Sequence, residues 1–208
     1  MSTNEYKTIL RIDSSLRGDD SISRRLGDNV VERLLRQHPN ATVEHVDLAG
    51  GMPSIDAAWV AANFTAAEQR SAVQRERLAA SDAAVAQLRR ADAIVLTTPV
   101  YNFSVPAALR DWIDHVCRAG MTFRYTEHGP EGLLADRPVY LVVASGGVEL
   151  GGPVDFASTY LRQVFRFIGI SDVHLVGAER TAADSDAAVA GAMRQLDQRL
   201  PAVAGAVA

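Results

Sequence analysis

The sequence predicts an α/β protein built on a doubly wound, five-stranded parallel sheet. Two observations lead to this prediction. Five short β-rich runs alternate along the chain with segments that have helical spacing. The central runs are apolar over their whole length, as expected of strands that crossover helices bury on both faces. With 208 residues, the chain is expected to form a single domain covering residues 1–208.

The predicted strands cover residues 8–12, 42–46, 93–98, 139–144 and 173–176. The second of these alternates polar and apolar residues, so we expect it at an edge of the sheet. Five strands favour the flavodoxin-like order 2-1-3-4-5 over the six-stranded dinucleotide-binding order. In that order the ends of strands one, three and four meet, and a ligand belongs over them.

Helices fill the segments between the strands. In residues 23–37 the apolar residues Leu26, Val30 and Leu34 are four apart, and Pro39 closes the segment. An alanine-rich region over 66–90 is either one long helix or two. Two further helices are predicted at 156–168 and 185–200.

The remaining helix follows Pro106, a residue suited to a first helical turn. Its apolar positions, including Leu109, Trp112 and Ile113, have the spacing of one buried face and extend to Cys117. We therefore interpret Cys117 as a core residue and not as a nucleophile.

Composition excludes several classes of function. A net charge of −4 with dispersed basic residues argues against a nucleic-acid surface. The apolar runs are too short to span a bilayer. A single cysteine and a polar N-terminal stretch favour the cytoplasm. The five histidines have no metal-ligand spacing, so no metal is expected.

The first of three loops expected to converge follows the first strand, over residues 13–23. A helix begins there, and Ser14, Ser21 and Ser23 offer hydroxyls beside its free N–H groups, an arrangement that suits a phosphate. Asp19 and Asp20 would repel a phosphate unless they point outward or pair with Arg17 or Arg24. The alternative interpretation is that Ser21 or Ser23 only caps the helix.

The second and third loops favour a flat ligand. Rings at Tyr101 and Phe103 can flank a planar ring, although aromatic residues in loops also serve as plugs over a core. After the fourth strand, Gly146 and Gly147 leave main-chain N–H groups open, unless they provide only flexibility. A phosphate and a large planar base together describe a mononucleotide, and FMN fits.

With these motifs in view, the chain resembles the FMN-dependent NADH azoreductases, also described as NADH:quinone oxidoreductases, which have the flavodoxin-like fold. The resemblance covers most of the chain. It rests on Ser14-Ser15 with Ser21-Ile22-Ser23, on Pro99-Val-Tyr-Asn-Phe, on the Gly-Gly loop and on Phe167-Ile-Gly-Ile-Ser-Asp. The most specific segment is Arg118-Ala-Gly-Met-Thr-Phe-Arg-Tyr-Thr-Glu-His-Gly-Pro-Glu-Gly-Leu.

The resemblance implies a set of site residues. The cofactor-binding residues would be Ser14, Ser21, Ile22, Ser23, Pro99, Val100, Tyr101, Asn102, Phe103, Ala144, Ser145, Gly146 and Gly147. It also implies a homodimer with sites at the subunit interface, where Phe123 and Tyr125 either line the substrate pocket or only pack the interface. The family often has Ser-Arg-Gly-Gly where this chain has Ala144-Ser-Gly-Gly, so substrate preference is expected to differ.

The implied activity is NADH:quinone oxidoreduction by a ping-pong hydride mechanism, with reductive cleavage of azo aromatics as a second reaction. The flavin supplies the chemistry, so we nominate no catalytic acid or base. The alternative is a non-enzymatic FMN electron carrier, although carriers of that kind are usually strongly acidic. A serine hydrolase is disfavoured because no G-x-S-x-G occurs.

Overall fold

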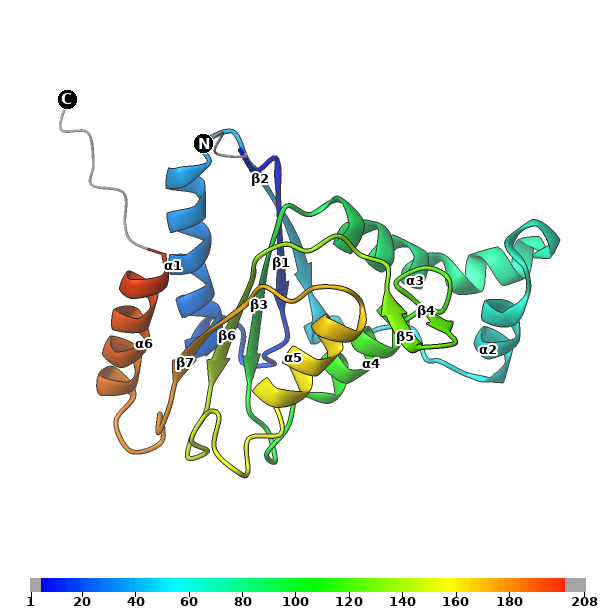
Figure 1. Ribbon diagram of the computed structural model, residues 1–208. Helices are drawn as coiled ribbons and strands as arrows, with labels where there is room; N and C mark the ends of the chain where they lie inside the picture. Colours follow the sequence, from blue (N-terminus) through cyan, green and yellow to red (C-terminus); the bar gives the residue numbers. More distant parts are fainter. Residues whose placement is uncertain (1–4, 201–208) are drawn as a thin grey trace.

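The computed structural model describes residues 5–200, and a five-stranded parallel sheet forms its centre (Figure 1). The strands run in the order β2-β1-β3-β6-β7. Their bounds are β1 (Thr8–Asp13), β2 (Thr42–Asp47), β3 (Ala93–Pro99), β6 (Val139–Ala144) and β7 (Val173–Ala178). The predicted order 2-1-3-4-5 is confirmed, with the second strand at an edge. The ends of the predicted domain, 1–4 and 201–208, lie outside the described residues.

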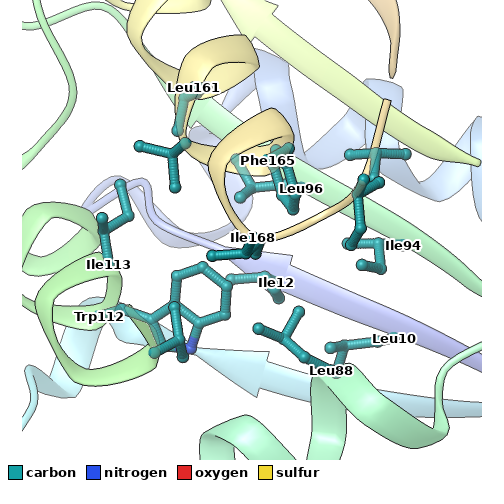
Figure 2. Close-up of a cluster of buried hydrophobic side chains, with 14 of the residues drawn as sticks. Leu10, Ile12, Leu88, Ile94, Leu96, Trp112, Ile113, Leu161, Phe165 and Ile168 are labelled. Carbon is teal, nitrogen blue, oxygen red and sulfur yellow. The ribbon is translucent and has the colours of Figure 1, made fainter. Parts of the chain in front are cut away.

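Helices cover both faces of the sheet. On one face lie α1 (Ile22–Gln37) and α6 (Ser185–Arg199), and on the other α3 (Ala72–Arg90), α4 (Ala107–Val116) and α5 (Ser158–Phe167) (Figure 1). Each face has its own core. In Figure 2, Leu88 of α3, Trp112 of α4 and Phe165 of α5 gather over the β1 and β3 side chains of the larger core.

The largely apolar character of the central strands follows from this two-sided burial. Ile9 belongs to the core beneath α1 and α6, whereas its neighbour Leu10 belongs to the opposite core, and both are almost fully buried. Successive strand residues point to opposite faces, so a strand covered on both sides is apolar at most positions, and buried polar residues such as Asp13 and Thr97 lie near the carboxyl ends, where they bond to each other.

The structure decides one alternative that the sequence left open and adds elements that the sequence did not predict. The region 66–90 contains one α-helix, α3, which begins after a Ser71–Gln74 capping box and follows the short 3-10 helix η3 (Ala67–Gln69). The helix α2 (Ala57–Phe64) and the hairpin of β4 (Phe123–Thr126) and β5 (Gly129–Gly132) were not predicted. Two further short 3-10 helices, η1 (Gly18–Asp20) and η2 (Leu48–Gly50), complete the elements described within residues 5–200.

The hairpin is held by tertiary contact. A Cβ added at Gly132 would lie 2.1 Å from the main-chain nitrogen of Gly169, so only glycine permits this approach.

Between residues 5 and 200, no helix has the length and apolar character needed to cross a membrane.

Candidate functional site

A cleft of about 510 Å³ opens at the carboxyl ends of the central strands. It joins the three loops predicted to converge and adds a fourth, the loop between β7 and α6. Its lining residues are Ser15, Arg17, Asp20, Ser21, Ile22, Ser23, Arg25, Pro99, Val100, Tyr101, Ala144, Gly146, Thr181, Ala182 and Ser185. The volume lies within the usual range of small-molecule sites, about 300–1,000 Å³.

The β1–α1 loop ends at the N-terminus of α1, which forms one wall of the cleft. Ser21 is the N-cap, and its Oγ accepts a hydrogen bond from the Arg24 N–H at 3.3 Å and lies 3.1 Å from the Ser23 Oγ. Within residues 5–200, the N–H groups of Ile22 and Ser23 donate to no acceptor. Capping and anion binding are therefore compatible here, because the cap leaves two donors of the first turn free.

The charges at this end of the cleft are mixed. Asp20 does line it, so one of the carboxylates considered in the sequence faces the ligand space. Arg17 and Arg25 line the same space and oppose that charge. Of the two arginines considered as partners for Asp19 and Asp20, Arg24 pairs with Asp47 instead, at 2.7 Å.

Two neighbouring serines in this loop have different surroundings. Ser14 is fully buried, and both its N–H and its hydroxyl donate to the main-chain carbonyl of Thr97, at 3.1 and 2.9 Å. It therefore does not line the cleft. Ser15, which the list of expected ligands omitted, does. The pair Ser14-Ser15 was visible in the sequence, but which of the two faces inward depends on the pleat at the end of β1.

The loop after β3 places Pro99, Val100 and Tyr101 along the cleft. Beyond them Asn102 and Phe103 form a tight turn in which both residues have positive φ, 49° and 69°. Tyr101 and Ser104 close this turn with reciprocal main-chain hydrogen bonds of 3.0 Å. Positive φ in residues other than glycine costs about 1–2 kcal/mol each, and such strain clusters at functional sites.

The turn presents its side chains to solvent instead of burying them. Asn102 is exposed, and Phe103 is 55% exposed, so Phe103 does not act as a plug over the core. Neither residue lines the cleft itself. The main-chain carbonyl of Phe103 accepts from the Phe156 N–H at 3.2 Å, which ties this turn to the loop after β6.

The loop after β6 contributes Ala144 and Gly146 to the cleft, while Ser145 is buried beneath it. The Ser145 hydroxyl accepts from the Val148 N–H at 2.8 Å. A Cβ on Gly146 would meet only the Ala182 Cβ, at 3.7 Å, so the Gly146 main chain is open to a ligand. Gly147 has open space around it but does not line the cleft.

The fourth wall was missed in the sequence. Thr181, Ala182 and Ser185 come from the β7–α6 loop and the start of α6. Thr181 donates through both its N–H and its hydroxyl to the Ser145 carbonyl, at 3.0 and 3.1 Å. The position of the fifth strand beside the fourth was the available signal, because neighbouring parallel strands end at the same edge.

The two expected substrate-pocket residues lie elsewhere. Phe123 packs against Phe167 with ring centroids 4.3 Å apart and against Tyr125 edge-on at 5.5 Å. Tyr125 is 75% exposed. No residue of their hairpin lines the cleft, and the hairpin lies at the side of the sheet with α3, α4 and α5 (Figure 1). The chain does not bring these residues together with its own cleft.

Cys117, at the end of α4, is partly buried, and burial raises the pKa of its thiol to about 11. A thiol of that pKa is protonated at neutral pH, which agrees with the interpretation of Cys117 as a core residue.

The residues of the cleft fit FMN. One end offers free N–H donors and hydroxyls at the start of a sixteen-residue helix, which is the chemistry that holds a phosphate. The other end is lined by Val100 and Tyr101, after β3, and by the open main chain of Gly146, after the neighbouring strand β6, which suits a flat, partly polar ring.

Comparisons with known proteins agree with this fit. A family model described as "Flavodoxin-like fold" matches residues 7–200. The FMN-dependent NADH:quinone oxidoreductase 1 of Hahella chejuensis is 44% identical over 188 residues, covering 90% of this chain and 92% of that protein. The FMN-dependent NADH:quinone oxidoreductase of Cereibacter sphaeroides is 48% identical over 185 residues, covering 89% and 94%.

Two solved structures of azoreductases are also similar to this chain. An azoreductase from Bacillus anthracis (strain Sterne) superposes with a TM-score of 0.81 at 28% identity, covering 92% of this chain and 96% of that one. An FMN-dependent NADH-azoreductase from Bacillus anthracis (strain Ames Ancestor), in complex with FMN, superposes with a TM-score of 0.82 at 26% identity, covering 93% and 97%.

Proposed function

Because the chain belongs to the flavodoxin-like family of FMN-dependent NADH:quinone oxidoreductases, we propose that it uses FMN and NADH to reduce quinones. The observation that supports this most is the cleft of about 510 Å³, which joins the N-terminus of α1, with its free N–H donors, to the loops that follow β3 and β6. The names of the relatives favour an enzyme over the non-enzymatic electron carrier considered in the sequence.

The proposed contacts follow the two ends of the cleft. Ser15, Ser21, Ile22 and Ser23 would hold the phosphate and ribityl chain. The ring would lie against the segments 99–103 and 144–147. Ser14 and Ser145 would not contact the ligand; their hydrogen bonds to the main chain would hold the two loops that line the cleft.

When bound, FMN would supply two-electron hydride chemistry between NADH and a quinone or, over two cycles, an azo bond, and we propose a ping-pong sequence in which donor and acceptor alternate. The main-chain N–H groups of the loops after β3 and β6 would orient the ring, with one face left open to the donor and the acceptor. No side chain is assigned as an acid or base, since solvent reaches the cleft and supplies the protons. Azo cleavage needs twice the electrons, so we propose it as the secondary reaction.

We also propose a homodimer. Phe123 and Tyr125 lie away from the cleft of their own chain, so a role in substrate binding requires that they reach the cleft of a second copy. Residues 1–208 would act as one domain in each copy. A cytoplasmic location is proposed from the cysteine content, since a single free thiol suits a reducing compartment.

Anaerobic stopped-flow spectroscopy of the FMN-reconstituted protein tests the proposed function. Mixing with NADH is expected to bleach the flavin absorbance, and benzoquinone is expected to restore it fully. Bound flavin that NADH does not reduce would instead indicate a carrier. A protein that retains no flavin would refute the assignment of the cleft. Light scattering after size exclusion reports the dimer separately.

A further inference from the structure

We infer that Arg24 is a positioning residue for the phosphate end of the cleft, an inference that rests on the proposed function and deepens it. Arg24 lies in the first turn of α1, yet its side chain does not line the cleft. The guanidinium contacts the carboxylate of Asp47 through both Nη1 and Nη2, at 2.8 and 2.7 Å. Its charge is therefore neutralised at the end of β2 and does not face the ligand space.

The same guanidinium fixes the main chain of the β1–α1 loop. Its Nη2 donates to the carbonyl oxygen of Ser15 at 2.7 Å. One residue earlier, Ser14 is held from the inner side by the Thr97 carbonyl. The loop is thus fastened on two sides immediately before the helix. The Ser15 carbonyl, whose partial negative charge would repel a phosphate, is engaged by a cation, while the Ser15 side chain lines the cleft.

Arg24 is itself held by a hydrogen-bond network centred on the buried Asp13. Arg11 donates from Nη2 to the Arg24 carbonyl at 3.2 Å and contacts Asp13 through Nε at 3.0 Å. Asp13, almost fully buried, also accepts from the Thr97 hydroxyl at 2.7 Å and lies 2.8 Å from the His45 Nε2. The network joins β1, β2, β3 and α1, so the position of Arg24 is defined by several elements at once.

Two mechanisms for Arg24 make opposite predictions. If Arg24 attracted the phosphate by its charge, removing Asp47 would free that charge and tighten FMN binding. If Arg24 acts by holding the Ser15 carbonyl, removing Asp47 leaves the guanidinium unanchored and weakens FMN binding. The contacts favour the second, because Arg17 and Arg25 are the cations that line the cleft.

The experiment compares FMN with riboflavin, which lacks the phosphate. The full-length apoprotein is titrated with each flavin, and quenching of flavin fluorescence gives the Kd. Arg24→Gln is expected to raise the Kd for FMN about tenfold or more, with the Kd for riboflavin changed by less than about twofold. Asp47→Asn is expected to raise the Kd for FMN by a smaller factor than Arg24→Gln does, and to leave the Kd for riboflavin nearly unchanged. Arg36→Ala, which removes an exposed i,i+4 pair with Glu32 on the same helix, is the matched control and leaves both unchanged.

Several results would overturn the inference. Equal weakening of FMN and riboflavin by Arg24→Gln would indicate a general structural defect, and no weakening of either would exclude the role. Tighter FMN binding by Asp47→Asn would indicate direct attraction, and that variant decides the question by itself if Arg24→Gln does not fold. If the wild-type protein binds FMN and riboflavin equally well, the phosphate site is refuted, but the proposed function stands. If it binds neither flavin, the proposed function itself is refuted.

Discussion

Ser14 gives both its main-chain N–H and its hydroxyl to one acceptor, the carbonyl oxygen of Thr97, at 3.1 and 2.9 Å. This double contact joins the end of β1 to β3 beneath the cleft. The next residue, Ser15, lines the cleft itself. Adjacent serines of the same loop therefore differ in role: one stabilises the loop, and the other is available to a ligand.

This difference gives a matched pair of variants. Ser14→Ala is expected to lower the free energy of unfolding by about 1 kcal/mol, because a buried hydrogen bond is lost. Ser15→Ala is expected to leave stability within about 0.5 kcal/mol of wild type while raising the Kd for FMN. Thermal unfolding of the apoprotein and FMN titration measure the two effects. The reverse pattern, with Ser14→Ala weakening only FMN binding, would contradict the assignment.

Two variants in the Asn102-Phe103 turn test backbone strain and ligand contact separately. Phe103→Gly is expected to be more stable than Phe103→Ala by about 1 kcal/mol, because glycine adopts a φ of 69° without a Cβ clash. Both variants lack the ring, so we expect both to lose FMN faster on dilution than wild type. Flavin retention and chemical denaturation measure the two properties. Wild-type retention and turnover in both variants would exclude Phe103 from the site.

Cys117 is expected to react slowly with iodoacetamide in the folded protein at pH 8. Burial raises the pKa of its thiol to about 11, so the thiolate that reacts is scarce until the pH approaches that value. Mass spectrometry after timed quenching follows the reaction, and the protein unfolded in denaturant serves as the fast control. Rapid alkylation of the folded protein at pH 8 would show that the thiol is activated.

Asp155 links the loop after β6 to α5 and gives a pH-dependent contribution to stability. Burial opposes the charge of its carboxylate, but hydrogen bonds from Ser158, Gly151 and Ala157 outweigh burial and lower its pKa below the ordinary 3.8. A lowered folded-state pKa stabilises the protein above the unfolded value, and this stabilisation is lost as pH falls through the folded value.

Asp155→Asn is therefore expected to be less stable than wild type at pH 7, and the difference is expected to shrink below about pH 4. Denaturant unfolding of both proteins across this range measures it. Asp111→Asn, on the exposed side of α4, is the control for loss of one negative charge. A gap between Asp155→Asn and wild type that stays constant down to pH 2 would show that the carboxylate charge is not the cause.

The sequence was sufficient to predict the sheet because its signals are local. Apolar strands, helix caps and the residues after each strand define the order and three walls of the cleft. The hairpin was not predictable in this way: Gly129-Pro130-Glu131-Gly132 has no strand pattern, and its strand depends on the contact of Gly132 with Gly169. The orientation of Ser14 and the pairing of Arg24 with Asp47 also depend on tertiary contacts.

A crystal structure of the protein with bound FMN tests the central claim most directly. We expect the phosphate within hydrogen-bond distance of the N–H groups of Ile22 and Ser23, and the ring between the turn at Asn102 and the main chain of Gly146. FMN bound outside this cleft, or inverted so that its phosphate lies at the β6–α5 loop, would contradict the account.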